Sequence, residues 1–282
     1  SQQHAVVDLP GVYSLSVTHG GAEDQRIACQ ALMTESIDVI VNVVDATNLE
    51  RHLYLTMQLL ELDIPVVVAL NMTDRLVAAG KQVDCDRLAQ SLGCPVVPII
   101  ATQKQGLEQL RKAVITQSVS NVSCSPVTFP APIEKAVEAI VTEQHTVFLK
   151  QKNLSRWMIL SLLAGDHTCL LDLPVSLKKS IEHHQQQALF ALDEDIDIMI
   201  ADTRYGFIEQ CVKDTINIVK NREATITERI DRIVLHRFLG LPIFFAVMYA
   251  LFFFSINVAG AFQDFFDNSF SFCDIFFLQT ST

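Results

Sequence analysis

The most constraining feature of the chain is a nearly continuous run of β-branched residues from Ile37 to Asp45. A strand that is apolar on both faces is typical of a parallel sheet covered by helices on both sides. Two further apolar runs, residues 65–70 and 95–100, have the same character. Strands that alternate with helices form an open parallel sheet, and ligands bind at the carboxyl ends of its strands. Helical patterns occupy the intervening segments at 23–33, 49–61, 84–92 and 107–119, and Leu53, Met57 and Leu60 are expected to form one buried stripe on the second.

The opening residues combine an apolar pair, Val6-Val7, with the sequence Asp8-Leu9-Pro10-Gly11. We expect the pair to belong to a buried strand and Pro10-Gly11 to form a sharp turn. At such a place in a P-loop nucleotidase, the aspartate holds the Mg²⁺ shell through water and the glycine N–H points at the γ-phosphate. Because Asp-x-x-Gly is a short pattern, a strand followed by an ordinary turn is the alternative.

Two further strand ends carry polar residues, Asn71-Met72-Thr73-Asp74 and Ala101-Thr102-Gln103. The Asp74 carboxylate can accept hydrogen bonds from N1–H and the exocyclic amine of guanine, a donor pair that adenine lacks. We expect Asn71 to brace the phosphate loop and the base edge, and the backbone N–H groups of residues 101–103 to meet guanine O6. Taken alone, residues 71–74 also fit an Asx-type turn. Three such segments on successive strand ends favour a GTPase that binds GTP or GDP with Mg²⁺.

Composition excludes one class of partner. The chain of 282 residues is half apolar and has a formal net charge of −11. Affinity for a phosphate backbone needs clustered Lys and Arg, so we expect no nucleic-acid binding, and a ribosome- or RNA-associated GTPase is disfavoured.

Three segments, residues 8–15, 42–56 and 69–74, resemble the ferrous iron transport protein B (FeoB) family. That family carries a cytosolic G domain, a helical domain and then a polytopic inner-membrane domain. Most GTPases have a lysine where this chain has Met72, as is usual in FeoB. The flexible thioether of Met72 can lie against the base face as a lysine stem would.

Two departures from the usual GTPase pattern limit the expected activity. Val12 follows Gly11 where many GTPases place a glutamine that orients the attacking water, so hydrolysis is expected to be slow. The chain contains no G-x-x-x-x-G-K-[ST], the loop that cradles the phosphates. We therefore expect the phosphate loop and the first switch to lie upstream of Ser1. In this interpretation the chain is N-terminally truncated, binds GTP poorly and is not catalytic by itself.

The rest of the chain is predicted to be helical, with no further strand. Helices are expected near 133–148, 155–166, 176–192 and 197–221, with Leu189 and Leu192 pointing inward on the third. Adjacent helix positions point about 100° apart, so Glu182-His183-His184 indicates a solvated face and not a metal site. The acidic run 193–197 is interpreted in the same way. The predicted parts are a partial G domain at 1–122, a helical domain at 123–226, a juxtamembrane helix with the first membrane helix at 227–267, and a tail at 268–282.

The run from Phe238 to Gln263 contains no charged residue over 26 positions. About 20 apolar residues suffice to cross a bilayer, so this run predicts a membrane helix, started by Gly240-Leu241-Pro242. A buried core helix is the alternative. Arginines precede the run and aspartates follow it, which places its N-terminal side in the cytosol. The arginines are Arg229, Arg232 and Arg237, and the aspartates are Asp264 and Asp267.

The resemblance implies GTP-regulated uptake of Fe²⁺ across the bacterial inner membrane, with the G and helical domains on the cytosolic side. It further implies guanine nucleotide, Fe²⁺, the lipid bilayer, homo-oligomers and small accessory proteins as partners. The pore would lie in further membrane helices beyond this chain. A membrane-tethered signalling or scaffold protein with a degenerate G domain, which does no transport, is the alternative.

Overall fold

The structure is a computed structural model that describes residues 5–16, 23–119, 126–147, 154–166, 173–218, 234–235 and 240–257. The chain forms two compact units, residues 1–220 and 221–282, and each is considered by itself.

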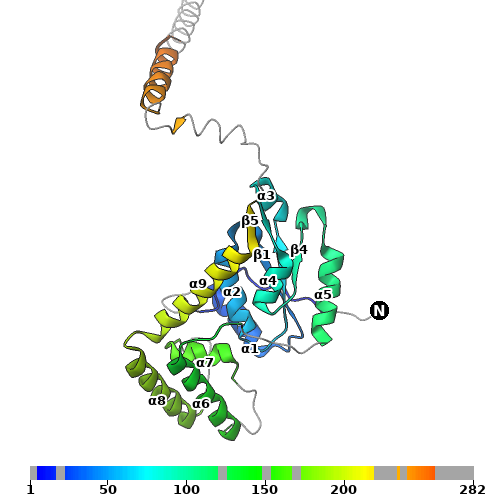
Figure 1. Ribbon diagram of the computed structural model, residues 1–282, viewed down its shortest axis with the longest axis vertical. Helices are drawn as coiled ribbons and strands as arrows, with labels where there is room; N and C mark the ends of the chain where they lie inside the picture. The colour runs from blue at the N-terminus through cyan, green and yellow to red at the C-terminus, as the bar shows by residue number, and fades with distance from the viewer. Residues whose placement is uncertain are drawn as a thin grey trace, which may run out of the picture. The chain divides into compact units, whose positions relative to one another are not determined.

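A parallel sheet with the strand order β1-β2-β4 lies at the centre of the first unit (Figure 1). The three strands are β1 (Ile40–Asp45), β2 (Val66–Asn71) and β4 (Val96–Pro98). Asp45 and Asn71 are partners in the register of β1 and β2, so the carboxyl ends of these strands meet at one edge. The predicted parallel sheet is confirmed.

Helices cover the two faces of the sheet (Figure 1). Helix α5 (Leu107–Val119) packs on one face at β2 and β4. On the opposite face, α2 (Leu49–Leu60) packs against β1 and α4 (Cys85–Leu92) against β4. The predicted stripe on α2 is confirmed, because Leu53, Met57 and Leu60 are all buried.

One face of strand β1 is less covered by helices than its β-branched sequence predicted. The side chains of Val41 and Val43 are 41% and 58% exposed. In the parallel register they lie beside Val67 and Ala69, which α5 covers. Because α5 lies over β2 and β4, it leaves Val41 and Val43 in contact with solvent.

The prediction of a buried strand at Val6-Val7 is wrong. Residues 5–12 have no regular secondary structure, and Val6 and Val7 are 90% and 62% exposed. A strand needs a neighbour that completes its backbone hydrogen bonds. In the part of the chain that the structure describes, the sheet consists of β1, β2 and β4, and residues 5–8 pair with none of these strands.

Short elements connect the strands and the helices. Helix α3 and strand β3 were not predicted, because a six-residue helix and a three-residue strand are too short to show a periodic pattern. The first helix of this part is α1 (Glu23–Thr34). Its short elements are the 3₁₀ turns η1 (Ala46–Asn48) and η2 (Ala101–Gln103), the helix α3 (Thr73–Ala78) and the strand β3 (Lys81–Val83).

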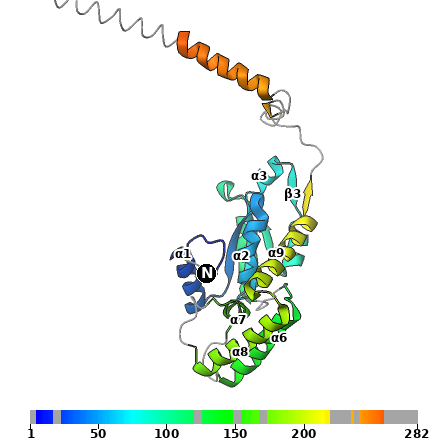
Figure 2. The same cartoon turned by 90° about the vertical axis from the view of Figure 1, so that its left-hand side faces the viewer.

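The described residues of the predicted helical region form four helices (Figure 2). They are α6 (Ala131–Val147), α7 (Arg156–Leu163), α8 (Val175–Leu192) and α9 (Ile196–Thr215). Helix α9 packs against α2, and α6, α7 and α8 pack against one another. Leu189 and Leu192 were expected to point inward on α8. Leu192 is half-buried and packs against the core, but Leu189 is 37% exposed. The buried face of α8 consists of Leu177, Ile181 and Ala188.

A strand follows α9, contrary to the prediction that the chain contains no further strand after the G domain. Strand β5 (Ile216–Ile218) pairs antiparallel with β3, with Ile216 opposite Val83. The Asp84 N–H also donates to the carbonyl of Thr215 at 2.9 Å. This strand was missed because three residues are too few to show alternation and its partner lies far away in the sequence.

The solvated helix face predicted at residues 182–184 is only partly correct. Glu182 and His183 are exposed. The side chain of His184 is 16% exposed, and its Nε2 lies 3.2 Å from Oε1 of Glu143 on α6. The packing of α6 against α8 places this imidazole at an interface between two helices.

The second unit contains a helix from Gly240 to Asn257 that is long and apolar enough to cross a membrane. Its large apolar side chains, such as Phe244 and Leu251, are exposed, as those of a lipid-facing helix are. The described part of this helix includes Pro242, and the predicted start at Gly240-Leu241-Pro242 stays a prediction. The predicted juxtamembrane helix that precedes this helix falls largely outside the described residues, and the tail at 268–282 lies entirely outside them.

Candidate functional site

Asn71 joins two of the three predicted strand-end segments. It is the last residue of β2, and its Oδ1 accepts a 3.1 Å hydrogen bond from the backbone N–H of Ala101. Ala101 is the first residue of η2, which follows β4. A side-chain bond between neighbouring strand ends holds the two loops at one edge of the sheet, as the predicted guanine site requires.

The loop at residues 101–103 is a 3₁₀ turn held by the chain around it. Ile100 and Gln105 exchange two backbone hydrogen bonds of 3.1 and 3.2 Å. Gly106 closes the loop with φ at +79°, and a Cβ atom there would lie 2.3 Å from the carbonyl oxygen of Pro98. Glycine is therefore required at position 106. All three loop residues, Ala101, Thr102 and Gln103, are exposed to solvent.

The segment after Asn71 turns sharply before α3 begins. Met72 adopts a left-handed conformation with φ at +60° and forms the N-cap of α3. The Thr73 hydroxyl donates to the carbonyl of Ile99 at 3.4 Å, which ties the start of α3 to the end of β4. Asp74 lies in the first turn of α3 and is exposed, so its carboxylate is open to a ligand.

The Asp8–Gly11 segment has a looser environment. Asp8 and Gly11 are exposed, while Leu9 and Pro10 are half-buried. A Cβ atom built at Gly11 would meet no other atom within 4 Å. The backbone at Gly11 is therefore open to a ligand and has room to move.

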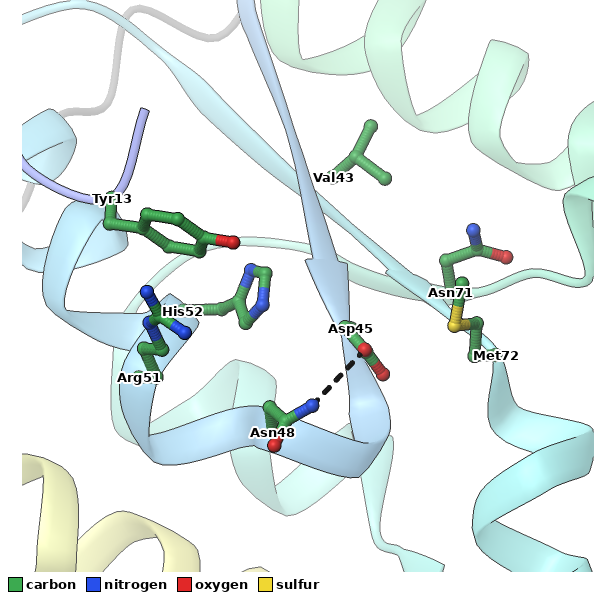
Figure 3. Close-up of a pocket in the computed structure, with 8 residues that line it drawn as sticks. All are labelled: Tyr13, Val43, Asp45, Asn48, Arg51, His52, Asn71 and Met72. Atoms are coloured by element: carbon green, nitrogen blue, oxygen red, sulfur yellow. Dashed lines mark hydrogen bonds between the residues drawn. The ribbon is translucent and has the colours of Figure 1, made fainter. Parts of the chain in front are cut away.

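A cavity of roughly 330 Å³ lies between Tyr13 and the end of β2. Figure 3 shows Tyr13 and His52 on one side, Asn71 and Met72 on the other, and Asp45 between them. Asp8, Gly11, Asp74 and residues 101–103 do not line this cavity. The lining residues are Tyr13, Val43, Asp45, Asn48, Arg51, His52, Asn71 and Met72.

Asp45 is the acidic residue of this cavity. Its partial burial opposes ionisation, but hydrogen bonds from the Thr47 hydroxyl and backbone N–H, from Asn48, and the nearby His52 outweigh that effect and hold the pKa of Asp45 below its usual value. Asp45 therefore caps η1 as a carboxylate, and it fixes the turn between β1 and α2.

The Tyr13 ring and the Arg51 guanidinium lie together on the side of the cavity away from Asn71 and Met72 (Figure 3). The Arg51 guanidinium carbon lies 3.8 Å from the centre of the Tyr13 ring, and the Tyr13 and His52 rings meet edge to face at 5.5 Å. Cation–π contact of this kind fixes the position of both side chains. Tyr13 follows Gly11 by two residues, so this contact links the end of the Asp8–Gly11 segment to α2.

Among the cavity-lining residues, the sequence prediction named Asn71 and Met72 but missed Tyr13 and Val43 as well as the polar residues Asp45, Asn48, Arg51 and His52. These four polar residues belong to the segment 42–56, which resembles the FeoB family. Their position directly after the apolar run of β1 was the available signal, because ligands bind at the carboxyl ends of parallel strands.

Comparison with known families gives two matches. Residues 1–114 match the family described as ferrous iron transport protein B, and residues 129–217 match the FeoB cytosolic helical domain.

Among curated proteins, the Fe(2+) transporter FeoB of Escherichia coli K12 is 38% identical over 274 residues, which cover 94% of this chain. The Fe(2+) transporter FeoB of Legionella pneumophila strain Paris is also 38% identical, over 271 residues and 94% of the chain. The matched region is 34% of the length of each relative, so the chain spans about one third of the curated relatives that it matches.

Solved structures show the same fold. A GDP-bound mutant of NFeoB from S. thermophilus superposes with a TM-score of 0.66 at 34% identity, covering 74% of this chain and 80% of that one. The mGMPPNP-bound NFeoB from S. thermophilus has a TM-score of 0.65 at 32% identity and covers 77% and 80%. The cytosolic domain of L. pneumophila FeoB has a TM-score of 0.60 at 31% identity and covers 74% and 78%.

Proposed function

Because the chain belongs to the ferrous iron transport protein B family, we propose that it forms the G domain, the helical domain and the first membrane helix of a GTP-regulated Fe²⁺ uptake protein in a bacterial inner membrane. The bond from Ala101 N–H to Asn71 Oδ1 carries this proposal, because it holds the two base-recognition loops together. The relatives named Fe(2+) transporter support Fe²⁺ as the transported substrate.

The base is read at the ends of β2 and β4. The exposed Asp74 carboxylate accepts from N1–H and the exocyclic amine of guanine, and Met72 and Thr73 flank the base. In the 101–103 loop, the N–H of Ala101 is engaged by Asn71 and that of Gln103 by the carbonyl of Ile100. Thr102 is therefore the residue whose N–H the loop offers to guanine O6.

The phosphate end lies at the Asp8–Gly11 segment. Mg²⁺ usually keeps several waters and binds one or two carboxylates together with substrate phosphates. The exposed Asp8 carboxylate fits such a shell through water, and the open backbone of Gly11 fits a contact to the γ-phosphate. Val12 is half-buried and has no polar group that could orient a water, so GTP hydrolysis is slow.

The chain alone binds guanine nucleotide weakly in this proposal, because its sequence contains no G-x-x-x-x-G-K-[ST] loop. The apolar helix Gly240–Asn257 anchors the protein in the bilayer, with the first unit in the cytosol.

A binding titration tests the nucleotide part of the proposal. A fusion places a G-x-x-x-x-G-K-[ST] loop, with its strand and helix from the E. coli relative, ahead of Ser1. In detergent, the fusion is expected to bind GDP about hundredfold more tightly than the chain alone. A fusion that binds no GDP would contradict the guanine site. Micromolar GDP affinity of the chain alone would contradict its dependence on a phosphate loop.

The transport part is tested in cells. Deletion of the gene that encodes this chain is expected to lower uptake of radiolabelled Fe²⁺, and the gene carrying Asp74→Ala should fail to restore it. Unchanged uptake after deletion under conditions in which the gene is expressed would contradict a role in Fe²⁺ transport.

A further inference from the structure

Three consecutive residues that follow the Asp8–Gly11 segment are held by one side chain of α2. The Oε1 atom of Gln58 accepts hydrogen bonds from the backbone N–H of Leu15 at 2.7 Å and from the Ser14 hydroxyl at 3.2 Å. Its Nε2 donates to the Ser16 hydroxyl at 3.2 Å. The amide of Gln58 thus uses both ends on residues 14–16, which lie more than forty positions earlier in the sequence.

The contact with Leu15 is shielded from water, and those with Ser14 and Ser16 are partly buried. Gln58 is fully buried, and Leu15 is 1% exposed and belongs to the main apolar core. A buried amide whose donor and acceptor are both satisfied specifies one arrangement, because any shift leaves a polar group unpaired away from water. Residues 14–16 are therefore fixed to α2 at a defined point.

The chain between this point and Asp8 is short. Gly11 lies three residues before Ser14, is exposed and has open space around it. The Tyr13 ring is held from the same helix by Arg51 and His52. The segment that is proposed to contact the γ-phosphate thus has one open part, at Gly11, and one fixed end on α2.

We propose that Gln58 is a positioning residue for the response to the γ-phosphate: its amide fixes residues 14–16 on α2 and thereby sets where Gly11 can lie. This inference rests on the proposed function, since it assumes that Gly11 faces the γ-phosphate. Gln58 itself contacts no nucleotide and acts through the backbone of residues 11–16.

Hydrogen exchange of the full chain in detergent tests the clamp without any nucleotide. Gln58→Met keeps the size of the side chain and removes its amide, so exchange at the Leu15 amide should accelerate by about fivefold or more. Gln58→Glu keeps an acceptor oxygen and should restore slow exchange at Leu15. Unchanged exchange at Leu15 in Gln58→Met would overturn the proposal.

Asn42→Leu is the matched control. Asn42 is also a buried amide that bonds α2, with Nδ2 2.8 Å from the Thr56 hydroxyl, but it makes this bond from β1. The control should lose stability in the same way while leaving the Leu15 amide protected. If hydrogen exchange at the Leu15 amide accelerated equally in both variants, the effect of Gln58→Met would reflect a general loss of stability. That result would overturn the positioning role of Gln58.

The nucleotide response distinguishes a positioning role from a structural one. In the phosphate-loop fusion, Gln58→Met should weaken GMPPNP binding by about fivefold relative to GDP, whereas Asn42→Leu should leave the ratio of the two affinities unchanged. An unchanged ratio in Gln58→Met would overturn the inference. A parent fusion that binds neither nucleotide would contradict the proposed function, and with it the positioning role, while the exchange data would still decide whether Gln58 holds residues 14–16.

Discussion

The guanidinium of Arg204 on α9 pairs with the carboxylate of Glu61 at the end of α2, with Nη2 and Oε2 2.6 Å apart. The two side chains are 5% and 0% exposed. Burial alone would lower the pKa of Arg204, but the charge of Glu61 and the hydrogen bond to it raise that pKa above its usual value. The Glu61 carbonyl also accepts from the N–H of Trp157 on α7 at 2.9 Å. Helix α2 therefore connects the sheet to the helical region through a charged pair within the core.

Replacing Arg204 by methionine should destabilise the first unit strongly, because it leaves the Glu61 carboxylate buried without a partner. The expected loss in free energy of unfolding is about 3–5 kcal/mol. Urea unfolding followed by the emission of Trp157, the single tryptophan of the chain, measures this loss. The double variant Glu61→Met with Arg204→Met should recover a large part of it, since no unpaired charge remains.

Arg26→Met provides the control for this experiment. Arg26 pairs with Glu23 at the surface, with side chains 53% and 67% exposed. Its removal should leave the urea midpoint unchanged, because solvent screens exposed pairs. If Arg204→Met shifted the midpoint no more than Arg26→Met, the structural role of the Glu61–Arg204 pair would be wrong.

Asn71→Ala should loosen the loop at residues 101–103, because Ala101 N–H loses its acceptor. A single hydrogen bond contributes about 0.5–1.5 kcal/mol net, so amide exchange at Ala101 should rise by roughly 2- to 10-fold. Asn71→Asp retains an acceptor oxygen and should keep the amide protected. Equal exchange rates in Asn71→Ala and the parent would show that this bond does not hold the loop.

Acid stability should depend on Glu143. Hydrogen bonds from the Ser180 hydroxyl and then from His184 lower the pKa of Glu143 below its usual value. A carboxyl group with a lowered folded-state pKa contributes stability above its unfolded pKa, about 4.3, and loses that contribution as the pH falls through the folded value. Because the Glu143 side chain is 44% exposed, the contribution is at most about 1 kcal/mol.

Glu143→Gln should therefore be less stable than the parent at pH 6, and the difference should vanish in strong acid. Urea midpoints measured across the acidic range test this. A difference between the two proteins that grows as the pH falls would have the wrong sign and would contradict the assignment.

Two buried thiols should resist alkylation in the folded protein. Burial raises the pKa of Cys94 to about 12, and burial is also the first cause that raises the pKa of Cys211 to about 11. Thiolate is the reactive form, so iodoacetamide near neutral pH should leave both cysteines unmodified until urea is added. Peptide mass spectrometry gives the answer. Rapid modification of Cys94 without denaturant would contradict its burial.

Long periodic elements were predictable from the sequence. The helix at 107–119 was predicted with the bounds of α5, and the stripe of Leu53, Met57 and Leu60 identified the buried face of α2. In these cases the apolar period itself encodes the structure. Asn71 and Ala101–Gln103 were placed at one sheet edge because parallel strands bring their carboxyl ends together.

Features that depend on distant contacts were not predictable. Strand β5 exists because β3, more than a hundred residues earlier, offers it a partner. Gln58 is a polar residue that the sequence would place on the exposed face of α2, and its burial follows from contact with Leu15. Val6 and Val7 have strand-like sequence, yet no neighbouring strand in the described part of the chain pairs with them.

The central claim, that the loops after β2 and β4 recognise guanine, is tested most directly by exchanging the base. Asp74→Asn in the phosphate-loop fusion replaces an acceptor oxygen by an amide, which suits the carbonyl of xanthine better than the amine of guanine. Titration with both diphosphates should show GDP affinity falling by about hundredfold and XDP affinity rising. If Asp74→Asn left the affinities for GDP and XDP unchanged, Asp74 would not read the base, and the proposed guanine site would be wrong.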